Sequence, residues 1–260
     1  MCLGRLVTVV EALALVVAGV VAGMVSTVVG LASVVSYPAL LAIGLPPLSA
    51  NMTNTVALLF TGAGAAVGSR PELTGQGARI RRLAVITALG GGAGAALLLI
   101  TPSQTFERVA PVLIAAASVA LLLRRQPGGR NPGHDPPRHF VRNLSLLAGV
   151  FGVAVYVGYF GAAGGILMLA LLAAMVSEPL ARTNAVKNIL GAVANVVAAA
   201  AFAVLGHVDW AAVAPLAAGF IVGGWIGPAL VRWIPGQALR IVVAVCGLAV
   251  AVTLGISAYR

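Results

Sequence analysis

The sequence is a succession of long apolar stretches that leaves almost no room for a water-soluble surface. Hydrophobic residues make up 60% of the chain and charged residues 8%, whereas soluble domains carry about 25% charged residues. Lipid cannot satisfy an exposed backbone, and the stretches lack the alternation of barrel strands, so we expect helices throughout. The expected fold class is an all-α polytopic membrane protein. The stretches lie at 6–29, 31–45, 49–68, 80–100, 106–123, 143–160, 162–176, 180–205, 210–231 and 238–256.

The two halves of the chain resemble each other. Each carries, in the same order and about 130 residues apart, a glycine turn, an apolar run, a proline and a Thr-Asn pair. Duplicated halves are typical of transporter folds, which place the binding site between the repeats. We therefore expect a first transmembrane repeat (1–123), a linker rich in Arg, Pro and Gly (124–142) and a second transmembrane repeat (143–260). The matching residues are Gly30, Pro47 and Thr53-Asn54, and Gly161, Pro179 and Thr183-Asn184.

The number of crossings decides how the two repeats are oriented. Residues 12–45 are too long for one span of a core of about 30 Å, so the chain must turn near Gly30, and likewise near Gly161. If both arms of each turn cross, each half has about five helical segments and the repeats are inverted. If the arms form re-entrant hairpins, each half has about four crossings and the repeats are parallel. We favour inverted repeats with short broken helices meeting near the midplane, and the parallel arrangement stays open.

The net charge of +10 comes from 16 basic and 6 acidic residues. The arginines gather in short loops beside the apolar stretches, as the positive-inside rule requires, and form no basic stripe interleaved with aromatic residues. We therefore expect lipid and no nucleic acid as a partner, with cytoplasmic loops at 69–82 and 124–142. The start of the chain also fits a cleaved signal peptide, but the match of 12–29 to 143–160 predicts that this segment is retained.

Lys187 lies deep inside an apolar stretch, unlike nearly every other ionic residue. With a helix start near Pro179, it falls about eight residues, or roughly 12 Å, along the helix axis. A lysine there costs about 2.5–3.5 kcal/mol on insertion, so it is expected to face a partner or a water-filled cavity. Asn184 and Asn188 recur at helical spacing on a neighbouring face. The alternative is that Lys187 snorkels to the interface and the asparagines bond neighbouring helices.

Polar residues also begin the corresponding helix of the first half. A new helix is expected near Ser49, after two prolines, and it carries Asn51, Thr53 and Asn54. The N-termini of this helix and of its counterpart, which carries Thr183, would attract an anion through their N–H groups and dipoles. Short segments that lead into polar helix starts in both halves indicate a transport site. Ordinary helix capping, worth about 1 kcal/mol per cap, is the alternative.

Small residues at the two turns permit a close approach of the backbone. They are Gly30 and Ser33 in the first half, and Gly161, Gly164 and Gly165 in the second. Helix packing explains any single glycine in a chain that has 32. The paired positions at both turns make contact with a ligand an equal alternative.

The sequence offers no sign of a cofactor, a metal site or an enzyme. The acidic residues fall at segment ends or in loops, so no buried carboxylate relay is visible. The cysteines and histidines form no metal-ligand spacing, and no nucleophile elbow or phosphate-binding glycine loop occurs. We therefore expect a protein that is not an enzyme and needs no cofactor.

Several stretches resemble the TauE/SafE sulfite exporter family of bacterial membrane transporters. The resemblance covers nearly the whole chain and implies a secondary transporter of sulfite, sulfoacetate or other organosulfonates in the bacterial cytoplasmic membrane. In one departure, the first turn reads GLASVVSYPAL, with one glycine where the family has several. This opens the alternative that Ser33 and Ser36 have taken over contacts there and altered the substrate. The stretches are GLPPLSANMTNTVAL, SRPELTGQGARIRRL, GYFGAAGGIL, ARTNAVKNIL and FAVLGHVDW.

Together, the residues and the resemblance predict alternating access of two repeats around an anion site at the midplane. Two other functions stay open, a non-transporting scaffold or assembly protein and an anion channel. The expected partners are a small anion and the bilayer, and a homo-oligomer is left open. The predicted substrate-binding residues are Lys187, Asn184, Asn188, Thr183, Asn51, Thr53, Asn54, Gly30, Ser33, Gly161, Gly164 and Gly165.

Overall fold

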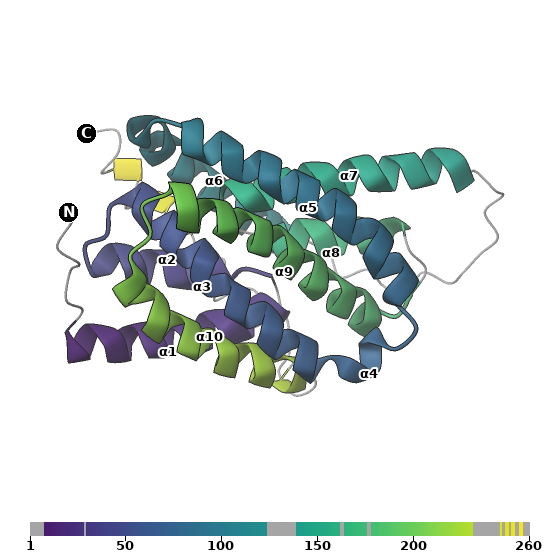
Figure 1. The fold of residues 1–260 in the computed structure, drawn as a ribbon, viewed down its shortest axis with the longest axis horizontal. Helices are drawn as coiled ribbons and strands as arrows, with labels where there is room; N and C mark the ends of the chain where they lie inside the picture. The colour runs from purple at the N-terminus through teal and green to yellow at the C-terminus, as the bar shows by residue number, and fades with distance from the viewer. Residues whose placement is uncertain are drawn as a thin grey trace.

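A computed structural model shows a bundle of long helices that lie roughly along one axis (Figure 1). It describes residues 8–28, 30–123, 139–161, 164–175 and 178–230, with short pieces at 245, 248–249, 251–252 and 255–256. Within these residues no strand occurs, so the predicted all-α fold class is confirmed. The helices are α1 (Val9–Val28), α2 (Ala32–Ala42), α3 (Pro47–Gly68), α4 (Arg70–Leu73), α5 (Gly77–Ile100), α6 (Ser103–Leu123), α7 (His139–Tyr159), α8 (Gly164–Met175), α9 (Leu180–Leu205) and α10 (Trp210–Leu230).

The helices include membrane spans and shorter segments. In the described part of the chain, four helices are long and apolar enough to cross a membrane: α1, α5, α9 and α10. In contrast, α2 and α8 have 11 and 12 residues, or about 16–18 Å, which is too short for a core of about 30 Å. The chain is thus a multi-pass membrane protein with a short helix after each glycine turn. Most of the predicted stretch at 238–256 lies outside the described residues.

Some helix boundaries differ from the predicted stretches. Helix α3 begins at Pro47, because proline at the first helical position has no N–H that would need a partner. Helix α7 begins at His139, so residues 139–142 of the predicted linker are helical. The predicted loop at 69–82 is largely helical as well, with only residues 74–76 between α4 and α5. Its arginines can extend their charged ends to the interface while the backbone stays in a helix.

The two halves interlock, because each supplies the packing partner of the other's first helix. Helix α1 packs along α10, and α7 packs along α5. A Cβ atom on Gly19 of α1 would stand 3.0 Å from the Cα of Gly219 on α10. Likewise, a Cβ on Gly94 of α5 would stand 2.8 Å from the backbone nitrogen of Tyr159 on α7. Small residues at helix interfaces allow such close backbone contacts in membranes.

Helices α3 and α9, which the predicted repeats would pair, run antiparallel. Ser49, near the start of α3, donates a hydrogen bond of 2.7 Å to the carbonyl of His207, just after the end of α9. At the other end, Arg182, near the start of α9, donates a bond of 2.6 Å to the carbonyl of Thr74, beyond α3. Figure 1 shows α3 and α9 side by side within the bundle. Corresponding helices of opposite direction are what an inverted arrangement requires.

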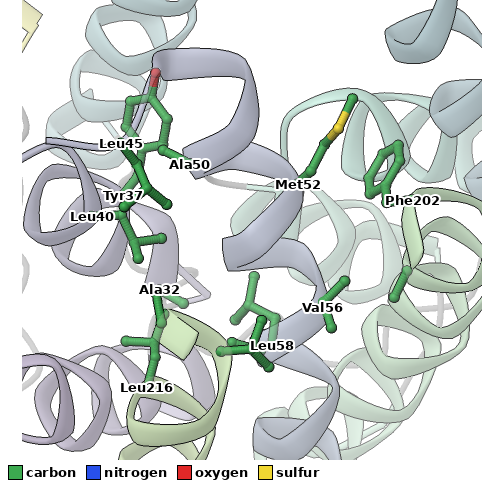
Figure 2. Packing of buried hydrophobic residues seen from close by; sticks show 14 of the residues in the cluster. Ala32, Tyr37, Leu40, Leu45, Ala50, Met52, Val56, Leu58, Phe202 and Leu216 are labelled. Carbon is green, nitrogen blue, oxygen red and sulfur yellow. The ribbon is translucent and has the colours of Figure 1, made fainter. Parts of the chain in front are cut away.

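Apolar side chains fill the bundle on both sides of its centre. One cluster includes Tyr37 and Leu40 on α2, Met52 on α3 and Phe202 near the end of α9 (Figure 2). Aromatic contacts reinforce it, since the rings of Tyr37 and Phe160 meet edge to face with centroids 5.7 Å apart. A second cluster lies toward the start of α9 and consists of Leu83, Val150, Met168, Leu172, Val186 and Leu190.

Candidate functional site

A small cavity lies where the middle parts of α3 and α9 face each other. Its volume is about 70 Å³, and one water needs roughly 10–15 Å³ in the same measure, so the cavity suits a small ion with a few waters. Gly62 of α3 and Ala192 of α9 line it, and a Cβ atom on Gly62 would stand 2.5 Å from the Cβ of Ala192. The turns that follow α1 and α7 complete the wall.

The two glycine turns meet at this cavity. Gly30 has φ +86° and Gly161 has φ +74°, in a region that costs other residues roughly 1–2 kcal/mol. Both close the preceding helix in the same way, since each donates its N–H to the carbonyl five residues earlier, at 3.0 and 3.1 Å. A Cβ on Gly30 would stand 2.6 Å from the carbonyl carbon of Gly165. The first turn therefore approaches the start of α8 through the backbone, and both turns line the cavity.

Two helices begin at the cavity wall. Ser33 lies in the first turn of α2, Gly164 and Gly165 open α8, and all three line the cavity. The first N–H groups of a helix have no partner within the helix and carry a partial positive charge. Two such helix starts at one cavity favour an anion.

Lys187 supplies a full positive charge to the same space. Its side chain lines the cavity and is only 3% exposed. Its Nζ donates a hydrogen bond of 3.2 Å to the carbonyl of Ser26, near the C-terminal end of α1. A cation at that helix end is favourable, because the last carbonyls carry partial negative charge. Among the described residues that line the cavity none is acidic, and Lys187 is the only basic one.

Two asparagines hold the walls together across the halves. Asn184 of α9 donates from Nδ2 to the carbonyl of Thr27 in the last turn of α1, at 2.9 Å. Asn51 of α3 donates from Nδ2 to the carbonyl of Tyr159 at the end of α7, at 3.0 Å. Carbonyls at helix ends have no N–H partner within their own helix, so these amides satisfy them. The two bonds are reciprocal, because each half caps a helix of the other.

The structure divides the predicted substrate-binding residues into two groups. Asn51, Thr53, Asn54, Thr183 and Asn184 stand beside or behind the cavity rather than in its lining. Asn54, for example, donates to the hydroxyl of Ser33 at 3.1 Å. Thr183 donates to the carbonyl of Pro179, and Thr53 accepts the N–H of Asp209. The predicted residues in the lining are Lys187, Asn188, Ser33, Gly30, Gly161, Gly164 and Gly165.

Sequence reasoning missed four hydroxyl residues of the lining: Ser26, Thr27, Thr55 and Thr61. Ser26 and Thr27 lie about one turn before Gly30, so their distance from that turn was the available signal. Thr55 and Thr61 both lie on α3, but six residues separate them, which places them about 120° apart around the helix. Helical spacing from Thr55 therefore gave no signal for Thr61.

Contacts between the halves close both ends of the α3 and α9 pair. At the start of α9, Glu178 forms ion pairs with Arg79 of α5 at 3.4 Å and with Arg182 at 3.2 Å. We call these three residues the ion-pair cluster. At the other end, the bonds from Ser49 to His207 and from Asp209 to Thr53 join α3 to the chain between α9 and α10.

Comparisons with known proteins agree with this architecture. The family model described as sulfite exporter TauE/SafE matches residues 15–254. A probable membrane transporter protein, ORF9 of Sinorhizobium sp, is 24% identical over 239 residues, which cover 92% of this chain and 90% of the relative. The probable membrane transporter protein YfcA of Escherichia coli K12 is 25% identical over 211 residues, which cover 81% and 77% of the two chains. No solved structure matches the chain.

Proposed function

The chain belongs to the TauE/SafE sulfite exporter family of membrane transporters, and on this premise we propose that it moves small sulfur-containing anions by alternating access. The observation that carries the proposal is the charge of the cavity. A buried lysine and two helix starts face a space whose described lining holds no acidic residue. A cavity built in this way stabilises an anion in a lipid-embedded protein.

The substrate we propose is a sulfur oxyanion, either sulfite or the sulfonate group of a compound such as sulfoacetate. Its oxygens accept several hydrogen bonds at once, and the lining offers hydroxyl groups from Ser26 and Ser33, together with helix N–H groups. The cavity volume of about 70 Å³ admits a few water-sized groups. An organosulfonate would therefore place its charged end in the cavity and require a wider space for the rest.

Alternating access is supported by the relation between the halves. The antiparallel course of α3 and α9, and the reciprocal bonds of Asn51 and Asn184, agree with inverted repeats around a central site. Contacts between the halves tie the bundle at both ends. We propose that the transport cycle breaks these contacts one end at a time.

The orientation we propose places the ion-pair cluster and the loop at residues 69–82 on the cytoplasmic side of the inner membrane. Described arginines gather at this end of the bundle, around α4, the start of α5 and the start of α9. Asp209 and Glu11 lie at the opposite end, where α10 and α1 begin. An excess of arginine on the cytoplasmic side is the pattern of the positive-inside rule.

The test is anion binding by the purified protein, with the charge at Lys187 removed. Thermal unfolding in detergent would be followed with sulfite, thiosulfate, sulfate, taurine and sulfoacetate. We expect at least one sulfur oxyanion to stabilise the protein in a concentration-dependent way, and Lys187→Met to abolish that shift. Arg81→Met is the matched control, because it removes an exposed positive charge outside the cavity.

Two results would contradict the proposal. Stabilisation of the wild-type protein by none of the anions would favour a scaffold or assembly protein. Equal stabilisation of wild type and Lys187→Met would remove the lysine from the site. In proteoliposomes we expect slow, saturable flux, whereas fast flux that does not saturate would indicate a channel.

A further inference from the structure

Thr61 is an unusual hydroxyl within the bundle. Most described helical threonines donate to a carbonyl one turn earlier, as Thr55 does to Asn51 at 2.9 Å and Thr87 does to Leu83 at 2.8 Å. Thr61 is 4% exposed and lines the cavity, yet its Oγ1 has no hydrogen-bond partner among the described residues. A buried hydroxyl without a partner is destabilising, so a structural role alone does not account for it.

Asn188 presents a second donor in the same wall. It lies on α9 next to Lys187, lines the cavity, and its Nδ2 is buried without a partner among the described residues. In this respect it differs from Asn184, one turn earlier, whose Nδ2 is engaged by the carbonyl of Thr27. An amide nitrogen can only donate. A ligand that binds to this Nδ2 would therefore have to supply a hydrogen-bond acceptor.

The backbone around Thr61 is held firmly by its neighbours. Helix α10 packs against it so closely that a Cβ atom on Gly224 would stand 2.7 Å from the carbonyl oxygen of Thr61. One residue further along α3, Gly62 packs against Ala192 of α9. These contacts fix the backbone of α3 at Thr61 and so hold its side chain beside the cavity.

We propose that Thr61 and Asn188 are direct ligands of the transported anion and select for oxyanions over halides. This inference rests on the proposed function, because it assigns two donors to the same site. The hydroxyl of Thr61 and the Nδ2 of Asn188 donate to two different oxygens of one anion, while Lys187 and the helix starts balance its charge. A halide has a single centre and gains less from two donors on separate helices, whereas an oxyanion with several acceptor oxygens satisfies both.

The first experiment compares Thr61→Val with Thr87→Val. Both remove a buried threonine hydroxyl with little change in shape, but Thr87 has an intrahelical partner and does not line the cavity. We expect Thr61→Val to raise the Kd for sulfite by about tenfold to a hundredfold, as the loss of a hydrogen bond to a charged group does. The same variant should leave the unliganded protein at least as stable as wild type, because it removes an unsatisfied group. Thr87→Val should leave the Kd unchanged.

Two further variants make the inference sharper. Thr61→Ser keeps the hydroxyl and should retain most of the affinity for sulfite. Asn188→Leu should weaken sulfite binding more than chloride binding, so that the ratio of the Kd for sulfite to the Kd for chloride rises. Thermal-shift measurements on the whole chain, with sulfite, sulfate and chloride as probes, give the Kd values for these comparisons.

The outcomes separate this inference from the function on which it rests. Wild type that binds none of the anions would overturn the proposed function. Wild type that binds sulfite, with binding lost in Lys187→Met but unchanged in both Thr61→Val and Asn188→Leu, would overturn this inference alone. Equal loss of sulfite and chloride binding in these two variants would overturn the selectivity.

Discussion

Gly30 and Gly165 meet backbone to backbone across the two halves of the chain. A Cβ atom on Gly30 would stand 2.6 Å from the carbonyl carbon of Gly165, and a Cβ on Gly165 would stand 2.6 Å from the Cα of Gly30. Gly30 belongs to the turn after α1, and Gly165 opens α8. The contact therefore joins the two places where each half interrupts its path through the bundle, beside the cavity.

Gly165→Ala should destabilise the fold through this contact. Gly165 lies in a helix, where alanine has the higher intrinsic propensity, so any loss of stability must come from the crowding. We expect a cost of about 1–3 kcal/mol, the usual range for overpacking, measured as a lower midpoint of thermal unfolding in detergent. Gly152→Ala in α7 is the control, because no atom lies within 4 Å of a Cβ built there. Equal stability of the two variants would contradict the prediction.

Two glycines with positive φ give a second prediction, because they share a backbone conformation but only one of them lines the cavity. Gly161 has φ +74° and lines the cavity, whereas Gly75 has φ +79° and is exposed between α4 and α5. Substitution of either glycine by alanine should lower the free energy of unfolding by about 1–2 kcal/mol through backbone strain. Only Gly161→Ala should also raise the Kd for the anion in the thermal-shift assay. A similar loss of affinity in Gly75→Ala would show that strain anywhere in the fold disturbs binding.

Elements with a strong local signal were predictable from the sequence. The glycines at 30 and 161 mark turns because few other residues adopt their conformation, and the prolines at 47 and 179 mark helix starts. Lys187 stood out because a charge inside an apolar stretch is costly, and it does line the cavity.

Residues whose role depends on tertiary contacts were harder to assign. Asn184 and Asn188 look alike in the sequence, but one caps the end of α1 while the other faces the cavity, because they point to different neighbours. Thr61 looks like Thr87 in the sequence, but it lines the cavity and its hydroxyl has no partner among the described residues, whereas the hydroxyl of Thr87 donates to Leu83. The sequence pattern gives the face of a helix, but which groups on that face are already satisfied depends on the packing of the other half.

The ion-pair cluster leads to a prediction about access to the cavity. Glu178→Gln should change the free energy of unfolding by less than about 1 kcal/mol, because partly exposed ion pairs contribute little. It should nevertheless speed the labelling of Gly191→Cys, which lines the cavity, by a thiol reagent applied on the same side. Native Cys2 and Cys246 would be replaced by serine. Glu107→Gln, on an exposed residue of α6, is the control. An unchanged labelling rate in Glu178→Gln would show that the ion-pair cluster does not control access to the cavity.

The direction of α3 against α9 gives a prediction about membrane topology. Gly77 begins α5 and His207 follows α9, both are exposed, and the antiparallel contacts place them at opposite ends of the bundle. In the variant without native cysteines, Gly77→Cys should react with an impermeant thiol reagent only from the cytoplasm and His207→Cys only from outside. Cysteine is suitable at Gly77 because no atom lies within 4 Å of a Cβ there. Parallel repeats with re-entrant hairpins would bring both positions to the same face. Labelling of both from one side would therefore exclude the inverted arrangement and leave the parallel one.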